Sequence, residues 1–458
     1  MQQAKEFSLN SLLAVLVILS IALSSQIWFP IGPKGATRTG APSVQVSPPS
    51  EQGVMPDVYR PERIYVRHHT GAMAMLQAGS TPYKQVWYSV QGLLRGMSAV
   101  SPNTQGEEGL DPEADVVTLV MPLSLTIENW AGLWSWNTSG LRSFSMQVDR
   151  ITLYLDPKTP MLQLAGGSGN AYRIGPLSPN EVRTLRDVIA SLDQNLFAQY
   201  RPLNAKETNV RVTTGLLVPA ATSVPVGSLD VKSPDQKAEE ARYFPDLTVV
   251  RQIDEKDARS YTDGQRLLRV TAAGELEYFS VSGSTNAIAP ELDRARTLAG
   301  EWVGSHGGWS QDVLMGWYAH QPGKTTLVFD LRLEGAFPVE SAGGALRVQV
   351  SAYRDAAGLQ HNSVTQYRRL PDFVPHFSQA HQAIISPERA IQLVSNTYAA
   401  QLLFEEVREV HLAYLIRLAG KTDADWILQP VWVVQVGEDH YYVPAVADAD
   451  SQPFMVRP

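Results

Sequence analysis

The feature that most constrains this chain is a run without charged residues from Phe7 to Pro33, near the N-terminus of 458 residues. Its centre, residues 12–23, reads LLAVLVILSIAL. A helix over residues 8–29 would rise roughly 33 Å, which matches a hydrocarbon core about 30 Å thick. The pattern therefore predicts a single transmembrane helix over residues 8–29, with the short segment of residues 1–7 before it.

A cleaved signal peptide is the alternative interpretation of this run. Its apolar centre is short, and Ala22 and Ser24 stand where a signal peptidase requires small residues. Before the run, Lys5 is the one basic side chain and Glu6 offsets it, so the positive-inside signal is weak. No second run is long and apolar enough to span. We therefore expect a single-pass protein with the bulk of the chain on one side of the membrane.

Composition excludes several classes of site and partner. The sequence contains no cysteine, so it has no disulfide framework and no thiolate metal site. The formal net charge is −8, from 38 basic and 46 acidic residues. This balance offers no basic footprint for nucleic acid, and we expect no nucleic-acid partner.

Residues 30–57 contain six prolines and four glycines, a composition typical of an extended linker. After it, strand-like and helix-like patterns alternate in three units. We predict an N-terminal ectodomain over residues 58–204, a central domain over 205–333 and a C-terminal domain over 334–458. Short hairpins with helices packed over them indicate an α+β fold of mainly antiparallel sheets.

Hydrophobic periodicity predicts the individual elements of these units. We expect strands at residues 63–66, 116–123, 144–155, 210–220, 248–253, 313–318, 326–333, 345–353, 410–418 and 426–436. We expect helices at residues 83–97, 179–197, 290–303 and 386–403. For the second helix, Ser178 followed by Pro179 and Glu181 predicts a capping box.

Motifs for catalysis or cofactor binding are absent from the sequence. The nine histidines form no HExxH pair, and GxSxG and phosphate-loop patterns are missing. His68 and His69 are adjacent, and on a strand they would point to opposite faces, which argues against a shared metal. His376 and His381 are expected in a loop or at a helix start. We therefore predict no enzyme, no cofactor and no metal site.

Three stretches are unusual enough to be candidate sites. In the first, an Asp263-Gly264 turn should join two strands, and Arg251 should form an ion pair. In the second, two glycines before Trp309 predict a tight turn, with an exposed binding loop as the alternative. In the third, Pro430 should lie at a sheet edge or a strand start, among core residues. The residues concerned are Arg251, Tyr261, Thr262, Asp263, Gly264, His306, Gly307, Gly308, Trp309, Gln429, Pro430 and Trp432.

Taken in order, these stretches resemble the YycH family. The resemblance rests on the apolar run, on PERIYV followed by Tyr83 and Trp87, and on VDRITLYL. It continues through FPD, VVRQI, YTDGQRLLRV and GELEYF, and it ends with HGGW and LQPVWVV. It covers nearly the whole chain after residue 57. The long linker at residues 30–57 departs from the family pattern.

The resemblance implies an accessory regulator of the YycFG (WalKR) two-component system of Gram-positive bacteria, with no catalysis of its own. It also implies a single pass through the plasma membrane, with residues 1–7 cytoplasmic and a three-domain, extracytoplasmic ectodomain. Such proteins act with a YycI-like partner on a sensor histidine kinase (YycG/WalK-like) that controls cell-wall metabolism. The sign of regulation varies within the family. The classes left open are an extracytoplasmic envelope hydrolase and a secreted wall-binding protein.

The predicted span can itself be interpreted as a contact surface. Leucines 12, 16, 19 and 23 form one stripe along a helix, and small or hydroxylated residues dominate the stripe beside it. Small residues allow close helix approach in lipid, and hydroxyls can hydrogen-bond across the interface. We hypothesise that the second stripe contacts a partner helix. Its members are Ser8, Ser11, Val15, Ile18, Ala22 and Ser25.

Overall fold

The computed structural model describes most of the chain between residues 58 and 455. The described ranges are 58–96, 102–103, 114–134, 136, 146–166, 171–174, 177–208, 210–213, 216–232, 236–281, 287–309, 312–332, 337–341, 344–354, 360–399, 405–419, 425–437, 439–446 and 452–455. The expected cytoplasmic segment, transmembrane helix and linker, residues 1–57, lie outside them. None of the helices in the described ranges combines the length and the apolar character that a bilayer crossing requires.

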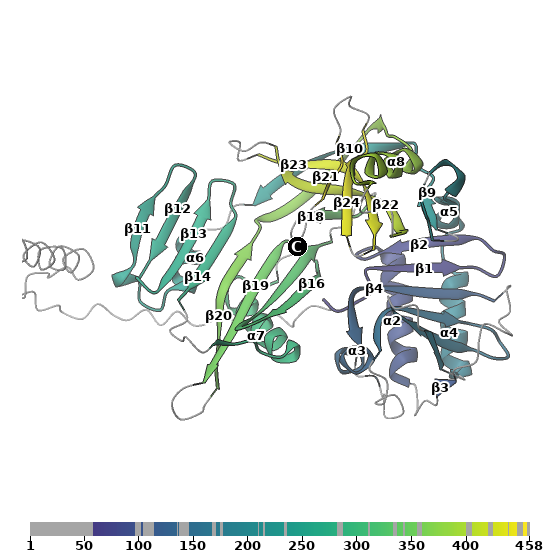
Figure 1. The fold of residues 1–458 in the computed structure, drawn as a ribbon, viewed down its shortest axis with the longest axis horizontal. Helices are drawn as coiled ribbons and strands as arrows, with labels where there is room; N and C mark the ends of the chain where they lie inside the picture. Colours follow the sequence, from purple (N-terminus) through teal and green to yellow (C-terminus); the bar gives the residue numbers. More distant parts are fainter. Residues whose placement is uncertain are drawn as a thin grey trace, which may run out of the picture. The chain divides into compact units, whose positions relative to one another are not determined.

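A seven-stranded antiparallel sheet occupies the N-terminal part, in the order β2-β1-β4-β5-β6-β7-β3 (Figure 1). Its strands are β1 (Arg63–Arg67), β2 (Met73–Gln77), β3 (Pro102–Asn103), β4 (Val116–Thr126), β5 (Gln147–Tyr154), β6 (Met161–Ala165) and β7 (Ala171–Ile174). Its helices are α2 (Thr81–Gly96), α3 (Ile127–Trp134), α4 (Pro179–Ala190) and α5 (Gln194–Ala198). All of these elements fall within residues 58–204.

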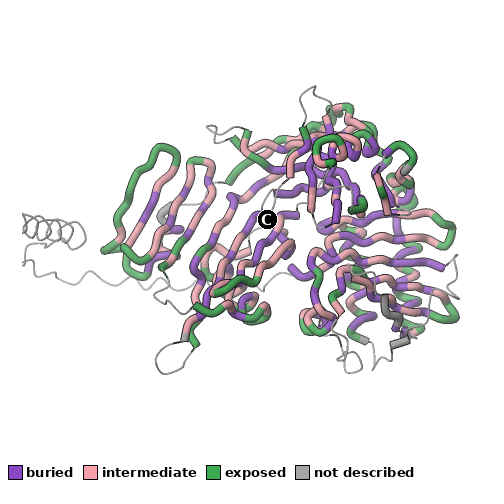
Figure 2. The backbone as a smooth tube through the Cα atoms, viewed as in Figure 1, coloured by how far each residue is buried: buried purple, intermediate pink, exposed green. Residues whose placement is uncertain are grey.

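The core of this part follows from the alternation along its strands and the apolar face of α2. Ile64 and Val66 on β1 are fully buried, as are Val86 and Val90 on α2. Figure 2 shows the same alternation of buried and less buried positions along the tube. Three indoles complete the packing, since Trp134 lies 5.2 Å from the Trp87 ring and 5.1 Å from the Trp130 ring.

The start of α4 corrects one expectation. Ser178 is the N-cap residue and Pro179 is the first helical residue, as the sequence indicates. The Ser178 side chain, however, makes no capping hydrogen bond. The predicted capping box is therefore wrong in the hydrogen bond that it assigns to the serine hydroxyl. The adjacent α5 is capped by Asp193, which accepts a hydrogen bond from Asn195 N.

Two short ribbons follow. Strand β8 (Tyr200–Pro202) pairs with β9 (Leu217–Pro219), and a 3₁₀ turn covers Ala205–Glu207. Strand β10 (Ser223–Lys232) pairs with the distant β21 (Asp372–Ala383). The predicted strand at residues 210–220 is therefore reduced to β9 and an isolated bridge from Val212 to Val407.

In the sequence, all the strands of a nine-stranded antiparallel sheet fall between β10 and β21. Its path is β11-β12-β13-β14-β20-β19-β17-β16, with β15 paired to β19. The strands are β11 (Arg251–Asp254), β12 (Ala258–Thr262), β13 (Arg266–Thr271), β14 (Leu276–Ser280), β15 (Ala287–Ile288), β16 (Val313–Gln321), β17 (Lys324–Leu331), β19 (Leu346–Arg354) and β20 (Gln360–Arg369). Because this sheet includes strands on both sides of residue 333, the expected boundary between 333 and 334 falls inside it.

Helices cover one face of this sheet. They are α6 (Gln236–Tyr243) and α7 (Leu292–Ser305). Register places Tyr261, Tyr278 and Tyr367 on the same face, where all three are buried. The Tyr278 ring lies 5.3 Å from Tyr243 of α6 and 5.0 Å from Trp302 of α7. A 3₁₀ turn at Leu247–Val249 replaces the first half of the strand predicted at 248–253, because Asp246 caps it through Thr248 N.

A five-stranded sheet closes the fold, in the order β18-β22-β23-β24-β25. Its strands are β18 (Val339–Ser341), β22 (Val407–Leu418), β23 (Trp426–Val436), β24 (Asp439–Pro444) and β25 (Phe454–Met455), and its helix is α8 (Pro387–Thr397). Strands β18 and β22 are parallel and the other pairs are antiparallel. Both faces of β22 are buried, so its sequence is almost continuously apolar rather than alternating.

Pro430 corrects another expectation, because it lies inside β23, opposite Tyr414 of the neighbouring strand β22. Its carbonyl accepts a hydrogen bond from Ala445 N at 2.9 Å, just past the end of β24. In a strand, the N–H and the C=O of one residue point to the same side. The N–H that Pro430 lacks would therefore face β24, at the point where β24 has ended. The proline therefore removes no hydrogen bond to β22, which is why an interior strand tolerates it.

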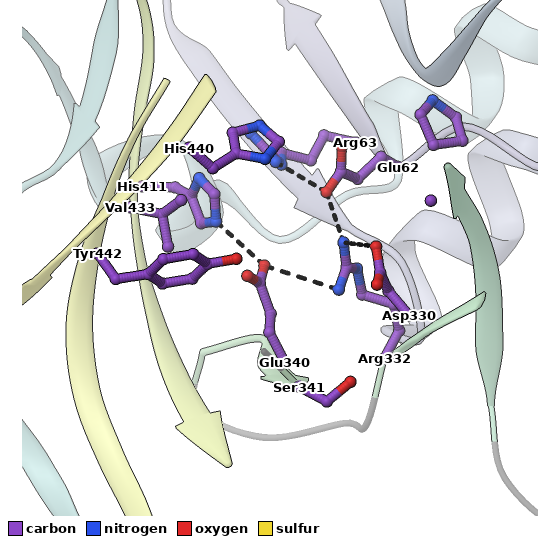
Figure 3. Close-up of a pocket in the computed structure, with 12 residues that line it drawn as sticks. Glu62, Arg63, Asp330, Arg332, Glu340, Ser341, His411, Val433, His440 and Tyr442 are labelled. Atoms are coloured by element: carbon purple, nitrogen blue, oxygen red, sulfur yellow. Dashed lines mark hydrogen bonds and ion pairs between the residues drawn. The ribbon is translucent and has the colours of Figure 1, made fainter. Parts of the chain in front are cut away.

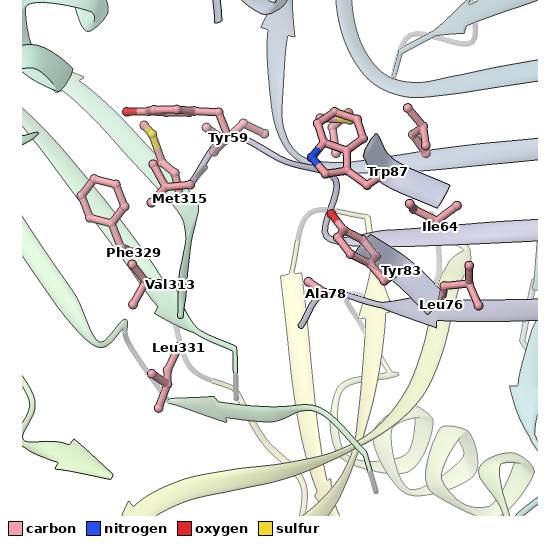
Figure 4. Packing of buried hydrophobic residues seen from close by; sticks show 14 of the residues in the cluster. Tyr59, Ile64, Leu76, Ala78, Tyr83, Trp87, Val313, Met315, Phe329 and Leu331 are labelled. Atoms are coloured by element: carbon pink, nitrogen blue, oxygen red, sulfur yellow. The ribbon is translucent and has the colours of Figure 1, made fainter. Parts of the chain in front are cut away.

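A single hydrophobic cluster joins the N-terminal sheet to β16 and β17 (Figure 4). Ile64 and Trp87 belong to it from one side, and Met315 and Phe329 belong to it from the other. The segment before β1 crosses between them, where Met315 N donates to Val58 O at 2.9 Å. The described fold is thus α+β with mainly antiparallel sheets, as predicted.

Candidate functional site

The most unusual site in the described residues is a buried cluster of charged side chains (Figure 3). Glu62 lies just before β1 and Arg63 begins that strand. Arg332 directly follows β17, Glu340 lies on β18 and His411 lies on β22. Together with Asp330, His440 and Tyr442 they line a cavity of about 50 Å³. We call these side chains, with Glu409, the ionic cluster. It connects the N-terminal sheet, the nine-stranded sheet and the five-stranded sheet.

Arg332 is at the centre of one half of the ionic cluster. Its Nη2 donates to Glu62 Oε1 at 2.6 Å, and its Nη1 lies 3.9 Å from Glu340 Oε1. Asp330 Oδ2 is 4.0 Å from Nη2. The side chain of Arg332 is 8% exposed, so these carboxylates replace water as its main electrostatic partners.

Arg63 and His411 form the other half. Arg63 is ion-paired with Glu62 at 2.9 Å and with Glu409. His411 lies between two carboxylates, with Nε2 3.1 Å from Glu340 and Nδ1 3.2 Å from Glu409. Burial and the charge of Arg63 lower the pKa of His411, which favours the neutral imidazole. Burial likewise lowers the pKa of His440.

Two glutamates of the ionic cluster, Glu62 and Glu340, stay ionised. Burial acts to raise the pKa of Glu62, but Arg63 and Arg332 outweigh it and hold that pKa well below its usual range. For Glu340, burial is also opposed, and Arg332 and His411 lower its pKa to about 2. The same carboxylates raise the pKa of the Arg332 guanidinium, against the effect of burial. The cluster is therefore a set of fixed charges over most of the pH range.

Asp330 is the exception within the ionic cluster. Burial raises its pKa to about 7, and Arg332 offsets only part of that rise. Its carboxylate lies against the backbone of Gly316, where an added Cβ would come within 1.9 Å of Oδ2. Gly316 is the extra residue at a register shift between β16 and β17, so the sequence needs a glycine there. Asp330 can therefore change protonation near neutral pH.

The charges of the ionic cluster indicate what it can do. Arg63 and Arg332 face the ionised Glu62 and Glu340, so an ionised Asp330 would add an excess negative charge to a dry site. A cavity of about 50 Å³ has room for water but not for a substrate, since small-molecule pockets are several hundred Å³. The arrangement suits a proton-sensitive junction between sheets better than a catalytic centre.

No local sequence pattern indicates the whole ionic cluster, because its members are spread from residue 62 to residue 442. One local signal was present in the run VREVHLAYLIRL. Glu409 and His411 are two apart in an otherwise apolar strand, so they share one face of it. A buried face that carries two ionisable side chains requires partners from another element.

The first predicted stretch lies on the nine-stranded sheet. Thr262 ends β12, and Asp263 and Gly264 form the turn to β13, with Gly264 at φ +88°. Asp263 Oδ1 accepts hydrogen bonds from Gln265 N at 2.9 Å and Arg266 N at 2.7 Å, so the predicted turn is confirmed. Tyr261 is buried beneath it. Arg251 is exposed at the start of β11, and no ion pair joins it to another described residue, so the expected ion pair stays a prediction.

The second stretch ends α7. His306 is the C-cap, and its ring stacks on Trp302 at 3.6 Å. Gly307 and Gly308 have φ values of +107° and +74°, and Gly308 N donates to Val303 O at 2.8 Å. A Cβ on Gly307 would lie 2.4 Å from Arg369 Nη1, beside a cavity of about 180 Å³. Trp309 packs edge-on against Phe329, so the tight-turn interpretation is confirmed.

The third stretch belongs to β23. Trp432 is fully buried and donates through Nε1 to Ile385 O at 3.0 Å, and Arg417 donates to Gln429 Oε1. The residues around Pro430 are core, as predicted. The three stretches therefore lie at a turn, a helix end and an interior strand, and the structure does not bring them together into one site.

Two histidine expectations need correction. Strand β1 ends at Arg67, so His68 and His69 lie in the hairpin after it and not on a strand. Their rings are 3.8 Å apart between centroids, which removes the argument that they face opposite ways. His376 and His381 lie on β21, because its edge pairing with β10 accommodates polar side chains at exposed positions.

The proposed partner-helix stripe, Ser8, Ser11, Val15, Ile18, Ala22 and Ser25, lies outside the described residues. Its role stays a prediction.

Comparison with known proteins identifies one informative likeness. The structure is similar to the crystal structure of YycH from Bacillus subtilis, with a TM-score of 0.56 and 14% identity, over 84% of this chain and 96% of that chain. The chain has a YycH-like fold. No family model and no curated protein matches the sequence. At 14% identity the likeness to YycH shows the fold alone.

Two other solved structures are also similar over part of the chain. An uncharacterized protein from Eubacterium rectale has a TM-score of 0.29 and 12% identity, over 54% of this chain and 87% of that chain. The YpeB C-terminal domain from Bacillus megaterium has a TM-score of 0.23 and 13% identity, over 50% of this chain and all of that domain. With TM-scores this low, neither supports an inference about this chain.

Proposed function

We propose that this protein is a membrane-anchored, non-enzymatic regulator of a sensor histidine kinase of the YycG/WalK type, acting with a YycI-like partner in the control of cell-wall metabolism. The observation that carries the proposal is the YycH-like fold over 84% of the chain. The order of motifs from PERIYV to LQPVWVV supports the same conclusion.

The ionic cluster supports a regulatory role over a catalytic one. Its fixed charges are held by one another, through Arg63 and Arg332, rather than directed at an open pocket. Its cavity of about 50 Å³ is too small for a wall fragment. These features favour a rigid extracytoplasmic body over an envelope hydrolase.

The proposed mechanism is contact between transmembrane helices. The stripe defined by Ser8, Ser11, Val15, Ile18, Ala22 and Ser25 would pack against a helix of the kinase or of the YycI-like partner. Hydrogen bonds between helices in lipid contribute about 0.6 to 2 kcal/mol each. A partner needs to bias a two-state kinase by only a few kcal/mol to change its output, so no enzymatic step is required.

Disulfide crosslinking in cells tests this mechanism. The native chain has no cysteine, so single cysteines can be placed at each position from Leu12 to Ser25 without background. We expect crosslinks to the kinase or the YycI-like partner at positions 15, 18 and 22, and weak ones at positions 12, 16 and 19. Absence of any crosslink to either protein along the whole helix would contradict the proposal.

A pair of substitutions tests the same surface by signalling output. Bulky side chains in the double variant Ser11→Ile/Ala22→Ile should alter kinase output without affecting membrane insertion. Leu16→Ile on the neighbouring stripe is the matched control and should leave output unchanged. Recovery of the intact N-terminus in the membrane fraction separates this anchored form from a secreted protein.

A further inference from the structure

Two adjacent histidines share the hairpin between β1 and β2. The hairpin is closed by His68 N to Ala72 O and by Gly71 N to His68 O, both at 2.8 Å, with Gly71 at φ +83°. Because the chain leaves the strand conformation after Arg67, both imidazoles can lie on one side. Their ring centroids are 3.8 Å apart.

Sheet register brings a carboxylate to the same hairpin. Val116 of β4 pairs with Arg67 of β1, so Asp115 lies next to the histidines. Asp115 Oδ1 accepts a hydrogen bond from His69 N at 2.7 Å, and its side chain is only 6% exposed. Each of the three residues offers one ligand atom, and these atoms lie within 4.8 Å of one another, the one such group among the described residues.

We propose that His68, His69 and Asp115 form a binding site for a divalent cation of the Zn²⁺ type. Zn²⁺ favours imidazole nitrogen and carboxylate oxygen at about 2.0 to 2.2 Å in a tetrahedron, which separates its ligand atoms by about 3.4 Å. His69 Nδ1 and Asp115 Oδ1 are already 3.5 Å apart. His68 already offers a third ligand atom within 4.8 Å of these two, so a small shift of its half-buried ring completes a three-residue set, and water takes the fourth position.

Neighbouring residues hold these ligands in place. Arg186 Nε lies 3.3 Å from Asp115 Oδ2, which fixes the carboxylate and leaves Oδ1 directed at the histidines. The Thr70 hydroxyl lies 2.9 Å from His68 Nδ1 and restrains that ring. Such outer partners orient metal ligands and affect affinity by tenfold or more. The positive charge of Arg186 opposes a cation, so we expect weaker binding than at a purely structural zinc site.

Isothermal titration of the full-length chain with ZnCl₂ tests the site. The protein is purified without a histidine tag, and the buffer contains no chelator. We expect one equivalent of Zn²⁺ to bind and the thermal unfolding midpoint to rise with zinc, because the folded state alone presents the three ligands together.

Three variants make the test specific. His69→Ala should weaken binding at least tenfold, and because the His69 side chain is 57% exposed, the variant should fold normally. Asp115→Asn should weaken binding similarly, with circular dichroism without zinc as the check on its fold. His381→Ala removes an exposed histidine outside the site and should bind like the native chain. No binding by the native chain, or unchanged affinity in His69→Ala, would overturn the proposal.

Discussion

Asp330 and Gly316 together create a titratable site where the sheets meet. The carboxylate fits against β16 only because Gly316 lacks a side chain. Burial in that position raises the pKa of Asp330 to about 7, whereas the neighbouring glutamates are held ionised by two arginines. At the scale of single residues, Asp330 is thus a carboxyl group of the ionic cluster whose pKa lies near neutral pH.

The first prediction concerns the pH dependence that Asp330 causes. Its folded-state pKa is raised, so the folded protein keeps a proton between about pH 4 and pH 7 that the unfolded chain has released. The associated stability is complete below pH 4 and is lost as the pH rises through 7. A shift of this size corresponds to at most about 4 kcal/mol.

Replacing Asp330 with asparagine removes that dependence. We compare the free energy of unfolding of Asp330→Asn with that of the native chain at each pH. This difference should shift in favour of the variant by about 2 kcal/mol as the pH rises from 5 to 8. Urea unfolding of both proteins at the two pH values measures the change. Parallel pH profiles for the two proteins would show that Asp330 does not titrate in this range.

At the scale of elements, two helices with the same start motif differ in how their first turn is satisfied. Both α4 and α8 begin with Ser-Pro followed by an acidic residue in the first turn. Ser386 accepts a hydrogen bond from Arg389 N at 3.2 Å, whereas Ser178 makes no such bond. The motif alone therefore locates the helix start but does not establish the cap.

This difference gives the second prediction. Ser386→Ala should lower the free energy of unfolding by about 1 kcal/mol, because it removes a capping hydrogen bond. Ser178→Ala is the matched control and should cost less than half as much. Urea unfolding followed by tryptophan fluorescence compares the two. Equal losses would indicate that the Ser386 bond contributes nothing.

Individual strands and helices show why some elements could be predicted from the sequence and others could not. Strand β23 matches its predicted bounds, residues 426–436, because a long apolar run with β-branched residues has few alternatives. The strand expected at 248–253 is partly a 3₁₀ turn, because a local Asp246 cap outweighs β propensity. Helix α6 was missed, since its few buried residues leave no clear period.

Prediction of sites failed for a different reason. The turn at Asp263 and Gly264 depends on neighbouring residues only, so the sequence indicates it. The ionic cluster and the His68, His69 and Asp115 group depend on sheet register between distant strands. Periodicity reports which face of a strand is buried, but it does not report which strand lies beside it.

For the whole molecule, the ionic cluster is the point at which three sheets share buried charge. Arg332 alone contacts carboxylates from the segment before β1, from β17 and from β18. Removing one partner from a buried ionic set leaves the others uncompensated, which is more costly than losing an exposed ion pair.

The third prediction follows from that arrangement. Arg332→Gln should lower the free energy of unfolding at pH 8 by about 3 kcal/mol, and by less at pH 5, where the orphaned carboxyl groups can take up protons. Arg259→Gln is the control, because Arg259 forms an exposed pair with Asp254 on the β11–β12 hairpin, and it should cost less than about 1 kcal/mol. A loss as small as that of the control would mean that water reaches the cluster freely.

The sequence distances across the ionic cluster also set an order of events during synthesis. Glu62 and Arg332 are 270 residues apart, and His411 of β22 follows later still. The N-terminal sheet can form early, since its strands are close in sequence, but of the two acidic partners of Arg63 only Glu62 is then present, and Glu409 is added much later. A chain that ends before β22 would lack Glu409 and His411, so the half of the ionic cluster beside Arg63 would be incomplete. An incomplete chain would thus differ from a complete one at the N-terminal sheet, beside Arg63, although the missing residues are C-terminal.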